Sequence, residues 1–202
     1  MSNTTEINPH LGATEVNPHL NGAGQPTAIN AEILSPVQIP AGTLLLGKYS
    51  IAAPLNLSTG EADLYICTCG KETFAAKIYR RKRAVKPEVV TALKALDSPY
   101  VAKLFDTGEY NGFPFEILPY YKNGSLQGRT FTLEELKSTV IPCINEALRL
   151  LHENDVIHKD LKPSNIMLSD DGRSVAIVDF GISSVVEDGN TVLVTQTGMT
   201  PA

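Results

Sequence analysis

Two short stretches in the C-terminal part of the chain hold acidic, amide and basic side chains at close spacing. The first, residues 158–165, reads His-Lys-Asp-Leu-Lys-Pro-Ser-Asn, and Asp179-Phe180-Gly181 begins fourteen residues after its end. Carboxylate and amide oxygens are ligands that Mg²⁺ prefers, and a nearby lysine can neutralise phosphate charge. The residue types and their spacing therefore indicate a site for metal ions and a phosphate donor.

These two stretches closely resemble the catalytic loop and the metal-binding turn of eukaryotic-type Ser/Thr protein kinases. The first differs from the family pattern His-Arg-Asp-Leu-Lys-Pro-x-Asn only by Lys159 in place of arginine. The resemblance covers roughly residues 47–202 and implies an α+β, protein-kinase-like bilobal fold. We expect a five-stranded antiparallel small lobe with one helix, followed by an incomplete, mainly helical large lobe.

The resemblance also implies a role for each polar residue of the two stretches. Asp160 would accept or orient the proton of the attacking hydroxyl, and Lys162 would neutralise charge on the transferred γ-phosphoryl group. Asn165 and Asp179 would hold Mg²⁺, while His158 would hold the loop in place by packing and hydrogen bonding. The cofactors implied are ATP and Mg²⁺, and the substrates are Ser/Thr hydroxyls of proteins.

A lysine in the first half of the chain matches the residue that grips the nucleotide in this family. Ala75-Ala76-Lys77 fits the strand lysine that contacts the α- and β-phosphates. That lysine should pair with a glutamate on the following helix. The family's glutamate position falls on Val89, and we predict that Glu88, one residue earlier, is the partner of Lys77.

The loop expected to cover the phosphates departs from the family pattern. It lies at residues 57–64, beginning with Leu57, and keeps only the middle one of three expected glycines, Gly60. Glycines let the backbone approach phosphate oxygens closely. Asp63 occupies another glycine position, and its charge near a polyphosphate should weaken nucleotide binding.

The segment that would read the adenine base follows an apolar run. By resemblance, Leu118 is the gatekeeper side chain, the carbonyl of Pro119 accepts a hydrogen bond, and the N–H of Tyr121 donates one. Proline lacks only a backbone donor, so its carbonyl still serves.

The remaining pattern predicts the elements that position these residues. A capping box at Thr132 and Glu135 begins a long helix that Pro142 should kink. We expect domains at 1–40 (a disordered tail), 41–121 (the small lobe) and 122–202 (part of the large lobe). The other predicted elements are strands at 48–57, 62–68, 73–79, 101–105 and 113–118, a helix at 87–96, a helix at 132–154, and a β pair from 165–168 and 175–178.

The tail contains a repeat, because Thr-Glu-Ile-Asn-Pro-His-Leu at 5–11 recurs as Thr-Glu-Val-Asn-Pro-His-Leu at 14–20, with a weaker copy at 27–30. One interpretation is a neutral duplication within a linker. The other is that Thr5, Thr14 and Thr27 are phosphorylated and bound by a phosphothreonine reader of the forkhead-associated type. Thr195 and Thr197 are further candidate phosphorylation sites.

Composition narrows the function classes. A net charge of −5 gives no basic surface for nucleic acid, and no apolar run is long enough for a membrane span. Three cysteines without framework spacing favour a reducing, cytoplasmic location. Cys67 and Cys69 form either half of a metal site or, as we expect, two small apolar residues on one strand face.

Two function classes remain open. An ATP-dependent protein kinase fits the retained acids and lysines, whereas the eroded glycine loop and the shifted glutamate would suit a pseudokinase or a phosphothreonine-presenting scaffold that signals by binding. The chain ends at Ala202, where a kinase would continue into further large-lobe helices. We therefore expect a fragment of a longer protein, poorly stable and inactive by itself, with apolar surface exposed.

Overall fold

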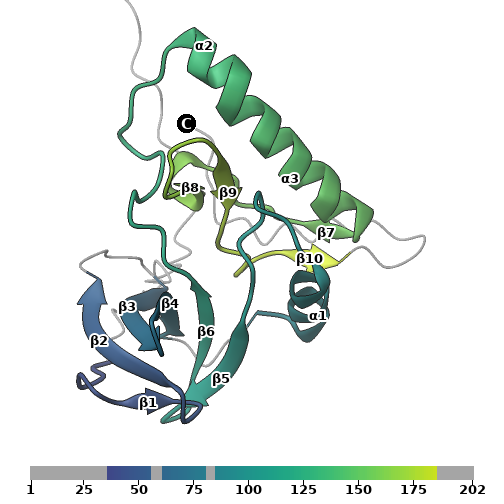
Figure 1. Cartoon of the computed structure of the whole chain (residues 1–202). Coiled ribbons are helices and arrows are strands. Elements are labelled where there is room, and N and C mark those ends of the chain that lie inside the picture. The colour runs from purple at the N-terminus through teal and green to yellow at the C-terminus, as the bar shows by residue number, and fades with distance from the viewer. Residues whose placement is uncertain (1–35, 56–60, 81–84, 186–202) are drawn as a thin grey trace, which may run out of the picture. The chain divides into compact units, whose positions relative to one another are not determined.

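The computed structural model describes residues 36–55, 61–80 and 85–185 of the 202-residue chain, all within one compact unit (Figure 1). Its first half is mainly β-structure and its second half is built around a long helical span. The elements in chain order are β1 (Leu44–Leu45), β2 (Tyr49–Leu55), β3 (Ala62–Cys69), β4 (Glu72–Tyr79), α1 (Pro87–Ala95), β5 (Asp106–Tyr110), β6 (Phe113–Pro119), α2 (Leu133–Glu135), η1 (Leu136–Val140), α3 (Ile141–Glu153), β7 (Val156–Ile157), η2 (Pro163–Asn165), β8 (Ile166–Leu168), β9 (Val175–Ile177) and β10 (Ser184–Val185).

A six-stranded antiparallel sheet forms the small lobe, in the order β1-β2-β3-β4-β6-β5. Alternation along β4 sends Phe74, Ala76 and Ile78 to one face, and Lys77 and Tyr79 to the other. The sheet confirms the predicted β-rich small lobe, with one short strand, β1, more than expected.

One predicted strand was wrong. Residues 101–105 form no strand, although Val101 makes an isolated parallel bridge to Ile177. The strand that follows is β5, whose sequence Asp-Thr-Gly-Glu-Tyr lacks apolar alternation. It lies at the edge of the sheet and pairs only with β6, so its other side does not require an apolar pattern.

Residues 36–40 belong to the fold, which corrects the predicted tail boundary at residue 40. Val37 and Ile39 are buried in a core on the face of the sheet opposite Lys77. The Tyr65 hydroxyl donates to the Val37 carbonyl over 2.5 Å and lies 3.2 Å from the Ile39 N–H, which donates to it. Cys67 lies in this core with 0% exposure and Cys69 packs against it, as expected for small apolar residues.

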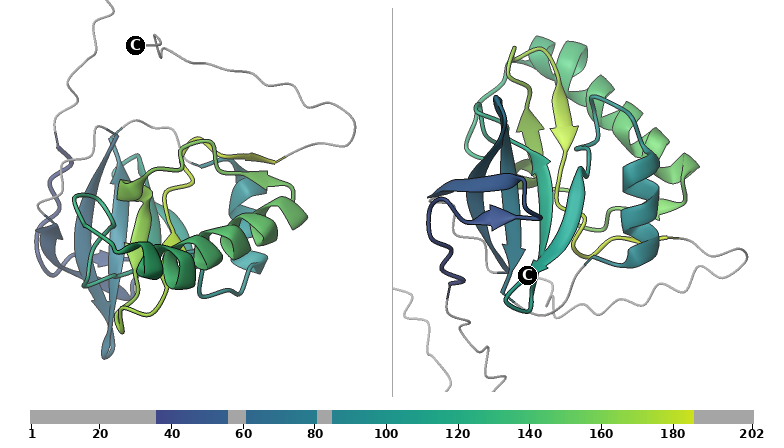
Figure 2. Two further views of the ribbon diagram at one scale, coloured as in Figure 1. Left: turned by 90° about the horizontal axis from the view of Figure 1, so that it is seen from above. Right: turned by 60° about the horizontal axis from the view of Figure 1, so that its bottom comes forward.

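A second core joins the other face of the sheet to the helices. In α1, Val89 and Leu93 pack with Ala147 and Leu151 of α3, and with Phe180. Figure 2 shows α1 and α3 beside the sheet, on the same side of it. This core fixes the second half of the chain against the strand that carries Lys77.

The predicted helix at 132–154 is present as three successive helical segments. The capping box is confirmed, since the Glu135 N–H donates to Thr132 Oγ1 over 3.1 Å and the Thr132 N–H donates to Glu135 Oε2 over 2.7 Å. Near Pro142, where the sequence predicted a kink, the structure has a turn of π-helix, η1, that ends two residues before the proline. Because Pro142 lacks an N–H, the wider turn, closed by the Ile141 N–H on the Leu136 carbonyl, accommodates the gap in the α-helical ladder.

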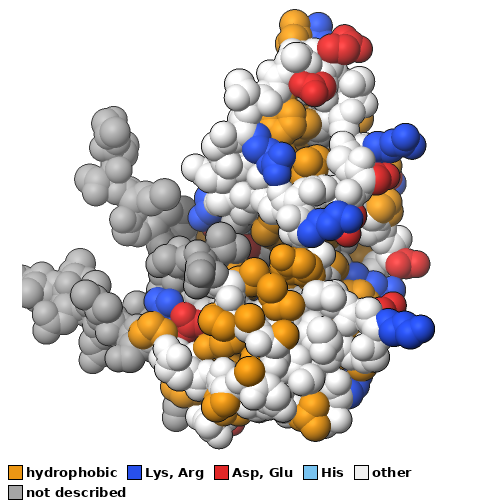
Figure 3. Space-filling view, turned by 60° about the vertical axis from the view of Figure 1, so that its left-hand side comes forward, with side chains coloured by type: hydrophobic (Ala, Val, Ile, Leu, Met, Phe, Trp, Pro, Cys, Tyr) orange, Lys and Arg blue, Asp and Glu red, His pale blue; other side chains and the backbone are white. Residues whose placement is uncertain are grey.

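Two small antiparallel pairs complete the described chain. The predicted pair is confirmed as β8 with β9, and β7 pairs with β10. On the face shown in Figure 3, hydrophobic side chains reach the surface between acidic and basic ones. Among the described residues no helix is long and apolar enough to cross a membrane. Several large hydrophobic residues of the second half are exposed: Leu133, Ile141, Leu161 and Ile182.

Candidate active site

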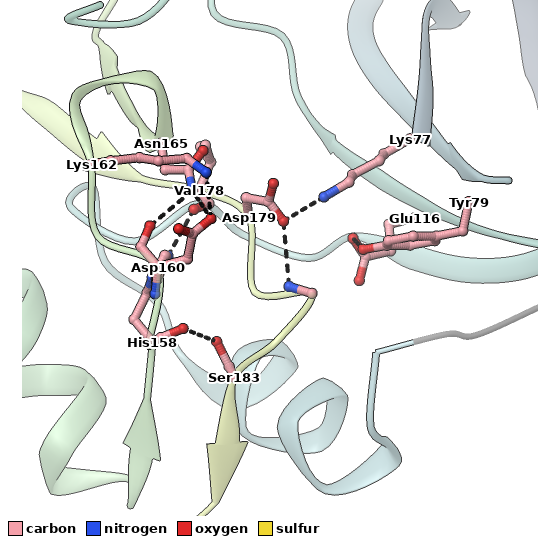
Figure 4. Close-up of polar contacts among 11 residues, drawn as sticks. Lys77, Tyr79, Glu116, His158, Asp160, Lys162, Asn165, Val178, Asp179 and Ser183 are labelled. Carbon is pink, nitrogen blue, oxygen red and sulfur yellow. Dashed lines mark hydrogen bonds and ion pairs between the residues drawn. The ribbon is translucent and has the colours of Figure 1, made fainter. Parts of the chain in front are cut away.

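The loop at residues 158–165 folds back on itself around Asp160 (Figure 4). The short 3-10 turn η2 places Asn165 beside Asp160. Asn165 Nδ2 donates to the Asp160 carbonyl over 2.9 Å and to Asp160 Oδ2 over 3.0 Å. Lys162 Nζ lies 2.7 Å from the same Oδ2. Lys159 has φ +66°, the left-handed conformation that reverses the chain here. The structure thus brings Asp160, Lys162 and Asn165 together as predicted.

His158 anchors this loop to the segment that carries Asp179. The Asp160 N–H donates to His158 Nδ1 over 3.2 Å, which leaves the proton of a neutral ring on Nε2, 2.9 Å from the Val178 carbonyl. The ring contacts Phe180 edge-on at 4.9 Å between centroids, and Ser183 Oγ donates to the His158 carbonyl over 3.0 Å. The predicted structural role of His158 is confirmed by these contacts.

The β8–β9 hairpin sets the position of the two predicted metal ligands. The Val178 N–H donates to the Asn165 carbonyl over 2.9 Å, so Asn165 and Asp179 leave the hairpin side by side. Both Asn165 hydrogen bonds use its amide nitrogen, and Asp179 uses Oδ1 for its contacts. Within the described residues Asn165 Oδ1 and Asp179 Oδ2 accept no hydrogen bond. Two hard oxygen atoms on one hairpin fit Mg²⁺, which takes few protein ligands besides substrate phosphates.

Asp179 also holds the strand lysine. Lys77 Nζ lies 2.5 Å from Asp179 Oδ1, and the Gly181 N–H donates to that oxygen over 3.3 Å. Burial raises the pKa of Asp179, but the charge and hydrogen bond of Lys77 outweigh it and the net pKa lies below its usual value. The carboxylate is therefore ionised near neutral pH. Asp179 has φ +67°, which turns its side chain toward the lysine.

The predicted pairing of Lys77 with Glu88 is absent from the described residues. Glu88 is exposed in the first turn of α1, whereas Val89 is fully buried in the core. The helix presents Val89 inward because the apolar spacing of Val89 and Leu93 fixes its rotation, and Glu88 then lies about 100° away around the helix.

A buried glutamate that sequence reasoning missed lies opposite Lys77. Glu116 of β6 is the register partner of Lys77 in β4 and is 5% exposed. Its Oε2 accepts a 2.8 Å hydrogen bond from the Tyr79 hydroxyl. In the sequence, the indication of a buried acid was a single glutamate inside the apolar run Phe-Pro-Phe-Glu-Ile-Leu at 113–118. Its position opposite Lys77 becomes clear only from the pairing of β4 with β6.

Asp63 does not face the phosphate site, which corrects the prediction that its charge would oppose nucleotide. It pairs across the sheet with Ile78 and so lies on the face opposite Lys77. Arg80 Nη2 and Nε donate to its carboxylate over 2.6 and 3.0 Å, and the Val37 N–H donates over 2.8 Å. The acid at this position therefore serves the fold.

The remaining predicted site residues fall in two groups. Leu118 and Pro119 end β6 opposite Ala75 and Phe74 of β4, and Tyr121 follows two residues later, where the chain leaves the sheet. The other predicted residues lie outside the described part of the chain, and their roles stay predictions: Leu57, Gly60, Thr5, Thr14, Thr27, Thr195 and Thr197.

Comparison with known proteins agrees with this geometry. A family model described as the protein kinase domain matches residues 59–202. The chain is 27% identical over 172 residues to the carbon catabolite-derepressing protein kinase of Saccharomyces cerevisiae, covering 80% of this chain and 27% of the relative. It is 28% identical over 158 residues to the probable serine/threonine-protein kinase MARK-C of Dictyostelium discoideum, covering 71% and 20%.

A bacterial relative is similar over a shorter stretch. The probable serine/threonine-protein kinase pknA2 of Bifidobacterium longum is 30% identical over 110 residues, covering 52% of this chain and 14% of the relative. The chain spans less than a third of the length of each of these three relatives.

Proposed function

This chain belongs to the protein kinase domain family, and on that basis we propose that its site transfers the γ-phosphate of ATP to Ser or Thr hydroxyls of protein substrates. The observation that carries the proposal is the convergence of five polar side chains from β4, the 158–165 loop and the end of the β8–β9 hairpin. Lys77 meets Asp179, while Asn165 and Lys162 both meet Asp160. These are the groups that in-line phosphoryl transfer requires.

Asp160 is the group that would receive the substrate hydroxyl. Its Oδ2 accepts from Lys162 and Asn165, and its Oδ1 accepts no hydrogen bond from the described residues. That free oxygen can hydrogen-bond the hydroxyl and orient it for attack. Lys162 lies beside the same carboxylate, where its charge stabilises the negative charge that develops on the transferred group.

Two further contacts would hold the nucleotide. Lys77 offers its ammonium to the α- and β-phosphates, and its contact with Asp179 keeps the side chain directed into the site. Asn165 Oδ1 and Asp179 Oδ2 would hold Mg²⁺, which when bound neutralises phosphate charge. The hairpin fixes both oxygens on one rigid element, so they need little rearrangement to bind.

Phosphotransfer from [γ-³²P]ATP tests the proposal on the longest natural form of the protein, with a mixed Ser/Thr protein substrate. We expect incorporation that requires Mg²⁺ and that falls about a hundredfold or more in Asp160→Asn, because the general base is lost. Glu153→Gln, far along α3 and exposed, is the matched control and should retain activity. Equal background signals from the natural protein and Asp160→Asn would favour the pseudokinase alternative.

A further inference from the structure

The sheet places a glutamate against the nucleotide lysine. Lys77 and Glu116 face each other across the antiparallel pair β4–β6, and directly opposed residues share a sheet face. Their exposed fractions are 6% and 5%. A basic and an acidic side chain are therefore buried together on the face that lines the active site.

Tyr79 completes this cluster. It lies two residues after Lys77 on the same face of β4, and its hydroxyl donates to Glu116 Oε2 over 2.8 Å. Lys77 Nζ lies 5.0 Å from the centre of the Tyr79 ring, within range of a cation–π contact. Glu116 Oε1 accepts no hydrogen bond from the described residues, and Lys77 Nζ forms its ion pair with Asp179 rather than with Glu116.

A buried carboxyl group such as that of Glu116 needs a hydrogen-bond donor, a nearby cation or a bound proton. An isolated buried carboxylate is strongly disfavoured, and paired or hydrogen-bonded ones persist. Burial, with a smaller effect of the Asp179 charge, holds the pKa of Glu116 above its usual value, although the charge of Lys77 and the Tyr79 hydrogen bond oppose that rise. Lys77 is thus the cation that this carboxylate faces.

The helix cannot supply the same charge. Val89 occupies the inward position of α1 at 0% exposure, and Glu88 points to solvent. Asp179 does contact Lys77, but in the proposed function it is also a metal ligand. Glu116 lies opposite Lys77 in the sheet and takes no part in the proposed metal site.

We propose that Glu116 is the positioning residue for Lys77 and takes the role that the sequence assigned to Glu88. The inference rests on the proposed function. Because Glu116 belongs to the hydrogen-bonded sheet, it would hold the ammonium toward the phosphates whatever the placement of α1.

Nucleotide binding to the full chain tests the proposal, with Mg²⁺ present and with ADP and adenosine as probes. Glu116→Gln should weaken ADP about tenfold, the scale of one charge-assisted hydrogen bond, and leave adenosine within about twofold, because adenosine has no phosphate for Lys77. Glu88→Gln is the matched control and should bind both ligands as the natural chain does. An equal loss for both ligands would indicate general disorder and overturn the proposal, as would a loss in Glu88→Gln alone.

A cycle without nucleotide separates this inference from the proposed function. In urea unfolding, Lys77→Met and Glu116→Gln should be non-additive by at least about fivefold in the unfolding constant, whereas Lys77→Met and Glu88→Gln should add. Additive effects at Lys77 and Glu116 would overturn the inference while leaving the proposed function in place. Coupled effects in a chain that binds no ADP would overturn the proposed function and the positioning role with it.

Discussion

The carboxylates of this protein differ in role because each finds a different partner. Asp160 accepts hydrogen bonds from Lys162 and Asn165 on one carboxylate oxygen. Asp179 contacts Lys77 through Oδ1, and its Oδ2 accepts no hydrogen bond from the described residues. Both carboxylate oxygens of Asp63 accept hydrogen bonds from Arg80. The motif alone predicted the first two, because both lie in short contiguous stretches whose spacing specifies the site. It could not predict Asp63, whose side chain faces away from the site through strand alternation.

Removing Arg80 tests the structural role of Asp63. Arg80→Met should lower the free energy of unfolding at pH 7 by about 1–3 kcal/mol, because a largely buried carboxylate loses its cation. Urea unfolding of the variant and the natural chain measures the difference. Lys103→Met, which breaks an exposed pair with Asp97, is the control and should change stability little.

The pH dependence of that difference has a definite sign. Burial opposes ionisation of Asp63, but the hydrogen bonds from Arg80 and Val37 prevail and its folded pKa lies below the usual value. A depressed acid contributes stability above its unfolded pKa of about 4, and that contribution disappears as pH falls through the folded pKa. The gap between the natural chain and Arg80→Met should therefore shrink below pH 4, and a gap that is constant with pH would contradict this account.

At the scale of elements, periodic segments were predictable and irregular ones were not. Strands β3, β4 and β6 follow from short β-prone, mainly apolar runs, and the helical span after Thr132 follows from a capping box and helical apolar spacing. The polar strand β5 was not predicted, because a strand at the edge of a sheet requires no apolar pattern. The position of Glu116 in the site was not predicted either. It depends on which residue lies opposite Glu116 across the β4–β6 pair, and strand register could not be derived from this sequence.

The docking of α1 depends on its apolar face rather than on a charge pair. Leu93→Ala should lower the free energy of unfolding by about 2–4 kcal/mol, because Leu93 is 2% exposed in the core shared with α3 and Phe180. Lys94→Ala, at the next and exposed position, should change it little. Chemical denaturation of both variants is the measurement, and similar small effects would show that α1 contributes little to the core.

The whole described molecule has a core on each face of its main sheet. One core joins the sheet to the helices and carries the active-site face, and the other is closed by residues 36–40. Sequence composition placed those five residues in a polar tail, because the stretch is short and flanked by proline and glycine. The burial of Val37 and Ile39 and their hydrogen bonds to Tyr65 and Asp63 show that these residues belong to the fold.

Truncation of that short segment's side chains tests its role. Val37→Ala with Ile39→Ala should lower the free energy of unfolding by about 2–4 kcal/mol, since both side chains are buried. Gln38→Ala, between them and exposed, is the matched control. Faster amide hydrogen exchange in β2 and β3 of the double variant would accompany the loss, and unchanged exchange would contradict a role for the segment in closing this core.

The placement of Glu116 on β6 separates charge from packing in the small lobe. Its position opposite Lys77 is set by strand register, and its hydrogen bond comes from Tyr79 of the same sheet. α1 in turn contributes Val89 and Leu93 to the core that joins the sheet to α3. In the proposed role, a substitution at position 116 would alter the site while leaving the docking of α1 in place.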